Sequence, residues 1–136
     1  MTKQLQLVVA QLNLLLSLVH DVLDLKIIES GKFVRNCSLF NPVKTFDFII
    51  AMFQAYGEMQ GTRISYRTVS VDSIRGNFRK VPDLLSYEKL PEFLVGDEVR
   101  LKQVLINLTK NALKFTPYGT VNIYAAYDEV TQLLYI

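Results

Sequence analysis

Cysteine and histidine are scarce in this chain of 136 residues, which has one of each. The single cysteine, Cys37, excludes an internal disulfide framework and any metal cluster built from cysteines. Because His20 is the only histidine, a zinc site would need several carboxylates, and no such cluster stands out. The sequence therefore gives no support to a disulfide-stabilised module or to a structural zinc domain.

The chain also lacks a strong charge of one sign. Fifteen Lys and Arg residues against thirteen Asp and Glu residues give a formal net charge of +2, and the basic residues are scattered along the sequence. A balance this close to neutral does not favour nucleic acid or an anionic membrane as a partner. Half of the residues are apolar, so the composition indicates one folded domain, or one small domain with an appendage.

Long uninterrupted hydrophobic runs are missing as well. The most apolar stretch, residues 5–19, is interrupted by Gln6, Gln11, Asn13 and Ser17. No small-residue cleavage site follows this stretch, as one would after a signal peptide, and it is too short to span a bilayer. We therefore expect a cytoplasmic location and no membrane insertion of this chain.

Residues 3–29 carry an amphipathic helical pattern, and Ser30 with Gly31 supplies a helix stop. Apolar residues recur near heptad spacing at Leu5, Val8, Leu12, Leu15, Val19, Val22 and Ile28. One interpretation is a core helix of a single domain. The other is a helix of an intermolecular bundle, which the length of the pattern favours.

The rest of the chain predicts an α+β fold. Strand patterns cover residues 37–43, 62–71, 92–97, 120–128 and 131–136, and helical patterns cover 45–61 and 98–115. Asp97 is a suitable N-cap for the second of these helices, and residues 72–91 are polar and irregular. This order of elements favours an α+β sandwich with helices on one face of a sheet.

The segment RLKQVLINLTKNALKFTPYG, residues 100–119, places Asn107, Asn111 and Lys114 at spacings of four and three on one side of a helix. Asparagine is unfavourable inside helices, but its amide oxygen suits Mg²⁺, and a lysine one turn away can contact phosphate. The alternative is that both amides merely solvate a half-exposed face, and spacing alone leaves both interpretations open. A neighbouring sector is expected to pack on the sheet: Leu101, Val104, Leu105, Leu108, Ala112 and Phe115.

Residues 96–123, GDEVRLKQVLINLTKNALKFTPYGTVNI, resemble the N-box region of sensor histidine kinases of two-component systems, in the ATPase superfamily shared with gyrase and Hsp90. Residues 14–33, LLLSLVHDVLDLKIIESGKF, resemble the second helix of the dimerisation hairpin of these kinases. Residues 40–66, FNPVKTFDFIIAMFQAYGEMQGTRISY, resemble the first strand, helix and second strand of their ATP-binding domain. The resemblance implies a dimerisation-type helix over 1–31 and a partial α/β sandwich of the ATPase type over 36–136.

The same resemblance implies roles for the three polar residues in binding Mg-ATP. Asn111 would be the principal Mg²⁺ ligand, Asn107 would support the metal and phosphates, and Lys114 would contact phosphate. In a complete protein of this kind, ATP phosphorylates a histidine, and the phosphoryl group passes to a receiver domain. The implied partners are a second copy or another kinase, through the amino-terminal helix, and a receiver domain.

The sequence also departs from the family pattern in two places. His20 is followed by Asp21 but lacks the polar-Pro step of a phosphoacceptor motif, so we expect no phosphoacceptor role and assign no catalytic residue. The strand pattern at 131–136 resembles the one that leads into the adenine-binding Asp-x-Gly-x-Gly motif, which the sequence does not contain. We therefore expect a kinase-like chain that is inactive alone, with weak or no ATP binding. The alternative is a non-catalytic dimerisation or scaffold module that pairs with itself or with a full-length kinase.

Overall fold

The computed structural model describes residues 19, 22–23, 26–27, 29–31, 34–75 and 89–136. The chain divides into two compact units, Met1–Arg35 and Asn36–Ile136. In the first unit the described residues from Val19 to Glu29 are helical, and the positive φ of Gly31, 66°, is typical of a helix end. The rest of the helix predicted over 3–29, including His20, lies outside the described residues. Among the described helices, none combines the length and the apolar character needed to cross a membrane.

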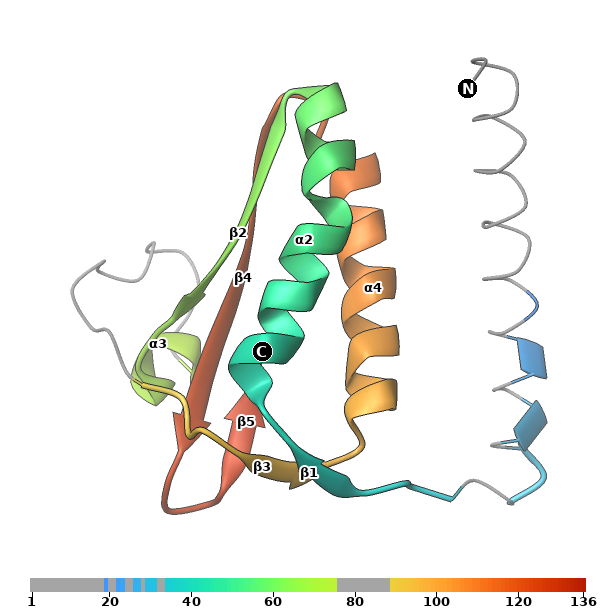
Figure 1. Cartoon of the computed structure of the whole chain (residues 1–136), viewed down its shortest axis with the longest axis vertical. Coiled ribbons are helices and arrows are strands. Elements are labelled where there is room, and N and C mark those ends of the chain that lie inside the picture. Colours follow the sequence, from blue (N-terminus) through green and yellow to red (C-terminus); the bar gives the residue numbers. More distant parts are fainter. Residues whose placement is uncertain (1–18, 20–21, 24–25, 28, 32–33, 76–88) are drawn as a thin grey trace. The chain divides into compact units, whose positions relative to one another are not determined.

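The second unit alternates strands and helices (Figure 1). Its elements are β1 (Ser38–Phe40), α2 (Pro42–Gln60), β2 (Thr62–Thr68), α3 (Val71–Arg75), β3 (Leu94–Gly96), α4 (Glu98–Lys114), β4 (Gly119–Asp128) and β5 (Leu133–Tyr135). The predicted order of strands and long helices is confirmed, and the class is α+β. The sequence did not predict α3, because a helix of five residues is too short to show an apolar period.

Helix α2 begins and ends at residues with clear capping chemistry. The side-chain oxygen of Asn41 accepts a hydrogen bond from the backbone N–H of Lys44 at 3.0 Å, and Pro42 occupies the first turn. This cap starts the helix three residues earlier than the apolar pattern predicted. At the other end Gly61 adopts a left-handed conformation, with φ of 71°, and donates its N–H to the carbonyl of Glu58 at 3.1 Å.

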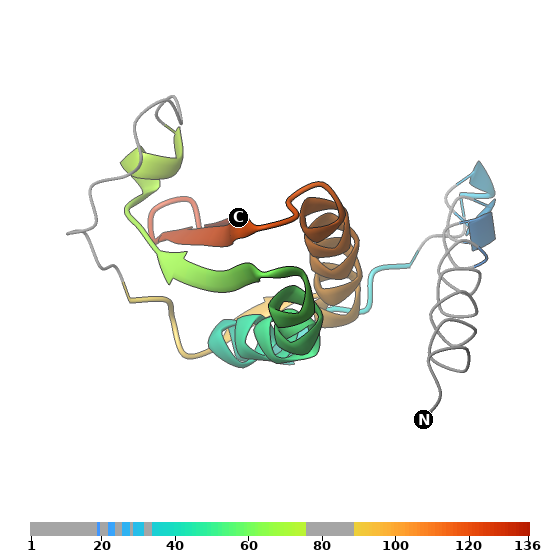
Figure 2. The ribbon, with the colours of Figure 1, turned by 90° about the horizontal axis from the view of Figure 1, so that it is seen from above.

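The strands of the described residues form two separate sheets. β1 and β3 make an antiparallel ribbon, and β2, β4 and β5 make a three-stranded sheet with β4 in the centre. β4 runs parallel to β2, from Thr62 opposite Gly119 to Thr68 opposite Ala125, and antiparallel to β5. Helix α2 lies on one side of the larger sheet, whereas α3 lies toward the other (Figure 2). A parallel pair needs a long crossover, which here includes α4.

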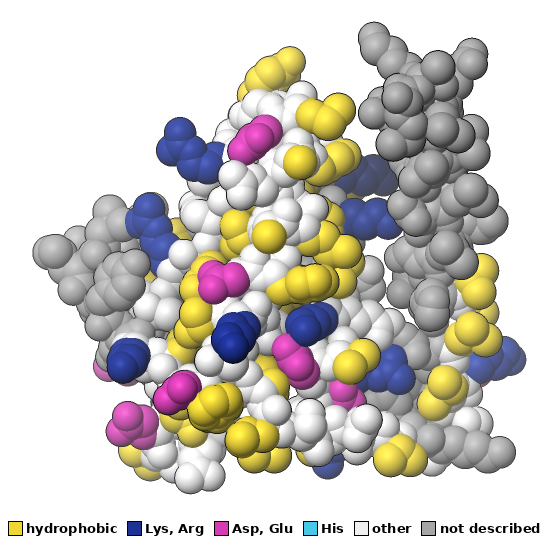
Figure 3. Space-filling view, viewed as in Figure 1, with side chains coloured by type: hydrophobic (Ala, Val, Ile, Leu, Met, Phe, Trp, Pro, Cys, Tyr) yellow, Lys and Arg dark blue, Asp and Glu magenta, His cyan; other side chains and the backbone are white. Residues whose placement is uncertain are grey.

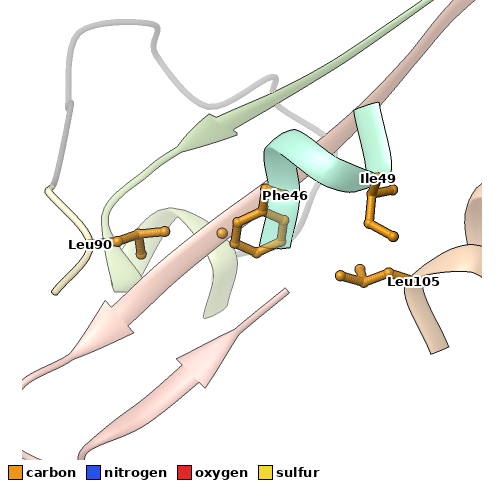
Figure 4. Packing of buried hydrophobic residues seen from close by; sticks show 5 residues of the cluster. Phe46, Ile49, Leu90 and Leu105 are labelled. Carbon is orange, nitrogen blue, oxygen red and sulfur yellow. The ribbon is translucent and has the colours of Figure 1, made fainter. Parts of the chain in front are cut away.

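The core lies between α2, α4 and the larger sheet. It is formed by Phe46, Ile49, Leu90, Leu105 and Ala125. The side chains of Phe46 and Leu90 point toward one another, as do those of Ile49 and Leu105 (Figure 4). The Phe46 ring also stacks on that of Tyr66 in β2, with 5.2 Å between centroids. This packing fixes the positions of both long helices relative to the sheet.

Candidate functional site

The candidate site is on α4, whose start is fixed by Asp97. One carboxylate oxygen of Asp97 accepts a hydrogen bond from the N–H of Arg100 at 3.1 Å, which confirms the predicted N-cap. The other oxygen accepts from the N–H of Asn36 at 3.0 Å. These two backbone hydrogen bonds lower the pKa of Asp97, because they favour its charged form. Asp97 therefore joins the first residue of the second unit to the start of α4.

The next residue, Glu98, joins α4 to α2. Its Oε1 lies 2.8 Å from Nζ of Lys102 and accepts a hydrogen bond from the buried hydroxyl of Thr45 at 2.9 Å. The ion pair with Lys102, followed by the hydrogen bond from Thr45, lowers the pKa of the Glu98 carboxyl group. Helix α4 is thus tied at its amino-terminal end to both neighbouring segments.

Acidification is expected to weaken this junction. Both carboxyl groups have lower pKa values in the folded chain than in the unfolded chain. Their stabilisation is therefore complete above the unfolded-state pKa and is lost as the pH falls through the folded-state pKa. We expect the melting temperature, followed by circular dichroism, to fall as the pH drops below about 4, by a modest amount because both carboxyl groups are close to solvent.

The double variant Asp97→Asn and Glu98→Gln is the control for this prediction. Asparagine keeps the N-cap, but neither new side chain titrates. Its melting temperature should fall less than that of the wild type between pH 5 and pH 3. If the melting temperatures of the two proteins fall equally over this pH range, the two carboxylates do not contribute to the pH dependence of stability.

The three predicted site residues share one side of α4, which we call the polar stripe (Asn107, Asn111 and Lys114). All three lie within the helical range, so their spacings of four and three bring them to one side. Asn107 is half-buried, and Asn111 and Lys114 are exposed. The Lys114 ammonium nitrogen lies 5.4 Å from the centroid of the neighbouring Phe115 ring. The stripe is thus open to a ligand at its carboxyl-terminal end.

The buried side of α4 differs from the predicted one. The residues buried there are Leu105, Thr109 and Leu113. Val104, Leu108 and Phe115, which were expected to pack on the sheet, are 54%, 61% and 76% exposed. That expectation was wrong because α4 packs against α2 as well as the sheet, and two neighbours set its buried side. The polar stripe consequently lies on the opposite side of the helix from the core and not beside the core face.

Two cavities in the second unit are formed by other elements. One, of about 570 Å³, is lined by residues of α3, the end of β4 and the following turn, together with Lys89. The other, of about 650 Å³, lies near β2 and the start of α2. None of the three stripe residues lines either cavity. In the described part of the chain, no three His, Cys, Asp or Glu residues are grouped to hold a metal ion.

Sequence reasoning missed a polar cluster at the far end of the sheet. The Arg75 guanidinium donates to Oδ2 of Asp128 at 3.0 Å and to the Tyr135 hydroxyl at 2.6 Å. Asp128 also accepts hydrogen bonds from Thr131 and Val130. The hydrogen bonding of Thr131, followed by that of Val130 and by the charge of Arg75, lowers the pKa of its carboxyl group. Arg75 lies 53 positions before Asp128 and 60 positions before Tyr135, so no local spacing in the sequence marks the cluster.

Comparison with known proteins gives related sequences among signal transduction kinases, although no family model matches the chain. The chain is 32% identical over 125 residues to the hybrid signal transduction histidine kinase L of Dictyostelium discoideum, which covers 90% of the chain and 6% of that protein. It is 37% identical over 110 residues to the sensory/regulatory protein RpfC of Xanthomonas campestris pv. campestris, covering 79% of the chain and 12% of RpfC. The histidine-protein kinase BarA of Escherichia coli is 28% identical over 82% of the chain and 10% of BarA.

Solved structures share the fold. The histidine kinase AdeS of Acinetobacter baumannii superposes with a TM-score of 0.66 at 18% identity, over 92% of this chain and 53% of AdeS. The histidine kinase ThkA, solved in complex with the response regulator protein TrrA, gives a TM-score of 0.59 at 20% identity, over 94% of this chain and 32% of that one. The related sequences show that the chain belongs to the histidine kinases of signal transduction. The solved structures, at 18% and 20% identity, show that it shares their fold. It spans only about 6 to 12% of the length of its curated relatives.

Proposed function

We propose that this chain contributes the magnesium and phosphate side of a nucleotide site in a histidine-kinase-type signalling protein. The observation that carries the proposal is the polar stripe, in which two carboxamides and an ammonium group share one side of α4. In this assignment Asn111 binds Mg²⁺, Asn107 supports the metal and the phosphates, and Lys114 contacts phosphate. The related sequences, which include signal transduction histidine kinases, support the same assignment.

The donor set of the stripe fits Mg²⁺ bound together with a nucleotide better than Mg²⁺ alone. Mg²⁺ takes six oxygen ligands and usually keeps several waters, with substrate phosphates among the rest. The stripe offers neutral amide oxygens, and the carboxylates of Asp97 and Glu98 lie at the opposite end of α4, where other groups hold them. Most of the charge that balances the metal would therefore come from the nucleotide, and Lys114 would offset the remaining phosphate charge.

This polypeptide by itself is proposed to bind nucleotide weakly and not to phosphorylate itself. The stripe supplies contacts to metal and phosphate only, and the 136 residues contain no Asp-x-Gly-x-Gly sequence for adenine. Each 1.4 kcal/mol of lost contact energy lowers affinity about tenfold, so loss of the base contacts should move the dissociation constant into the millimolar range. The proposed output, a phosphoryl group passed through a histidine to a receiver domain, belongs to the complete signalling protein.

A nuclear magnetic resonance titration tests this assignment. Adding a non-hydrolysable ATP analogue with Mg²⁺ should shift the side-chain amide signals of Asn107 and Asn111 and the signals of Lys114, with a dissociation constant in the millimolar range. Asn111→Ala should weaken the magnesium-dependent shifts at least tenfold. Asn122→Ala, which removes another exposed asparagine of the same unit, is the matched control and should leave them unchanged.

Two outcomes would count against the assignment. In the first, the analogue causes the same signal shifts with and without Mg²⁺. In the second, the signals that shift belong to residues outside α4. Micromolar affinity would instead overturn the expectation of weak binding while leaving the metal assignment in place.

A second candidate function is a non-catalytic dimerisation or scaffold module. The observation in its favour is that Val19, Val22, Leu23 and Ile27 of the first unit are exposed apolar residues on a helical segment. Such residues suit pairing with a second copy or with a full-length kinase. If this is the function, Asn111→Ala should leave pairing with a second copy or with a kinase unchanged. The same variant therefore separates the two candidate functions.

A further inference from the structure

Strand β2 is an edge strand of the larger sheet. It pairs with β4 along its whole length of seven residues, and within the described residues it has no strand partner on its other edge. An edge of this kind presents backbone N–H and C=O groups that a further strand can use. An added strand would have a regular template of seven residues.

Two arginines mark the outer side of this edge strand. Thr62 and Ile64 are buried toward the helices, whereas Arg63 and Arg67 alternate with them and are exposed. The residues opposite the arginines on β4 are the uncharged Thr120 and Tyr124. Within the described part of the chain, neither guanidinium group has an ion-pair partner. At about 3.3 Å per residue, the Cα positions of the two arginines are roughly 13 Å apart along the strand.

The inner side of the same edge opens into the cavity of about 650 Å³. Its walls come from the end of β2, the start of α2 and the segment before β3: Asn41, Val43, Tyr66, Arg67, Thr68, Lys89, Leu90 and Glu92. Val43, Tyr66 and Leu90 give it apolar walls. Tyr66, Arg67 and Thr68 all contribute to its walls, so the cavity lies beside the carboxyl-terminal end of β2.

We propose that the free edge of β2 binds an extended protein segment in which acidic and apolar residues alternate. The segment adds a strand beside β2 and gains main-chain hydrogen bonds there. Because successive side chains of a strand point to opposite faces, its acidic residues meet Arg63 and Arg67 while its apolar residues enter the cavity. This function does not depend on nucleotide binding at α4.

The test uses a fluorescent seven-residue peptide in which Glu and Val alternate, titrated with the full chain and followed by fluorescence anisotropy. We expect saturable binding that weakens as salt rises, because the arginine contacts are solvent-exposed. A permuted peptide of the same composition, with its Glu residues in one block and its Val residues in another, should bind at least tenfold more weakly. Equal binding of the two peptides would overturn the proposal, as would no binding of the alternating one.

Reversing the charge of the two arginines distinguishes binding at β2 from a general attraction between an acidic peptide and a basic protein. The double variant Arg63→Glu and Arg67→Glu should lose at least tenfold in affinity for the Glu-Val peptide and should gain affinity for the corresponding Lys-Val peptide. The matched control reverses two exposed cations of the first unit, Lys26→Glu with Arg35→Glu, and should bind the Glu-Val peptide as the wild type does. An equal loss in both double variants would contradict a site at β2. Circular dichroism melting checks that each variant is folded.

Discussion

Replacing Phe46 by alanine is expected to lower the free energy of unfolding by about 3 to 5 kcal/mol, the usual cost of removing a buried aromatic ring. The Phe46 side chain is 0% exposed, packs with Ile49 and Leu90, and stacks on Tyr66. Removing the ring leaves a cavity at the point where α2 meets the sheet. Urea denaturation, fitted to a two-state transition, measures the effect.

The matched control is Phe48→Ala, two residues further along the same helix. The Phe48 side chain is 46% exposed, and its ring lies 5.0 Å from the Lys102 ammonium nitrogen. Its removal should cost less than about 1 kcal/mol, because an exposed cation–π contact is weak. Similar losses for the two variants would mean that α2 does not bury the side on which Phe46 lies.

The second large effect is expected for Gly57→Ala. In a helix interior this substitution normally stabilises by about 1 kcal/mol, because alanine is the better helix former. Gly57 is buried, however, and a Cβ atom there would lie 2.6 Å from the carbonyl oxygen of Thr62. That oxygen belongs to the backbone of β2 and cannot turn away. We expect a loss of roughly 1 to 3 kcal/mol from overpacking.

Ala55→Gly is the control for helix propensity at an exposed site of the same helix. Its free energy of unfolding should fall by about 1 kcal/mol from helix propensity alone. This value shows how much of the Gly57→Ala effect helix propensity can explain. The measurement is again urea denaturation of both variants. A stabilised Gly57→Ala protein would show that the helix and strand separate easily at this point.

Features fixed by neighbouring residues could be predicted from the sequence. Asp97 caps α4 as expected because an N-cap needs only a side-chain oxygen and the N–H groups of the next turn. Gly61 ends α2 as expected, since its left-handed conformation is accessible to glycine at little cost. The shared side of Asn107, Asn111 and Lys114 follows equally from helix geometry.

Features that depend on distant residues could not be predicted. The buried side of α4 is set by contacts with α2, and Thr109, a polar residue, belongs to it although no hydrophobic pattern marks it. The hydrogen bonds of Arg75 with Asp128 and Tyr135 join segments that only tertiary folding brings together. The roles proposed for the polar stripe remain predictions, since they depend on what binds there.

The parallel pairing of β2 with β4 has a consequence for the order in which the protein can assemble. Ser65 and Asn122 face each other across this pair, although they are 57 residues apart in the chain. During synthesis on a ribosome, β2 emerges well before the only described strand that pairs with it. The larger sheet therefore cannot begin to close until β4 has been made, and contacts of this sequence separation are formed slowly. Until then, the apolar residues of α2 have no finished sheet to cover.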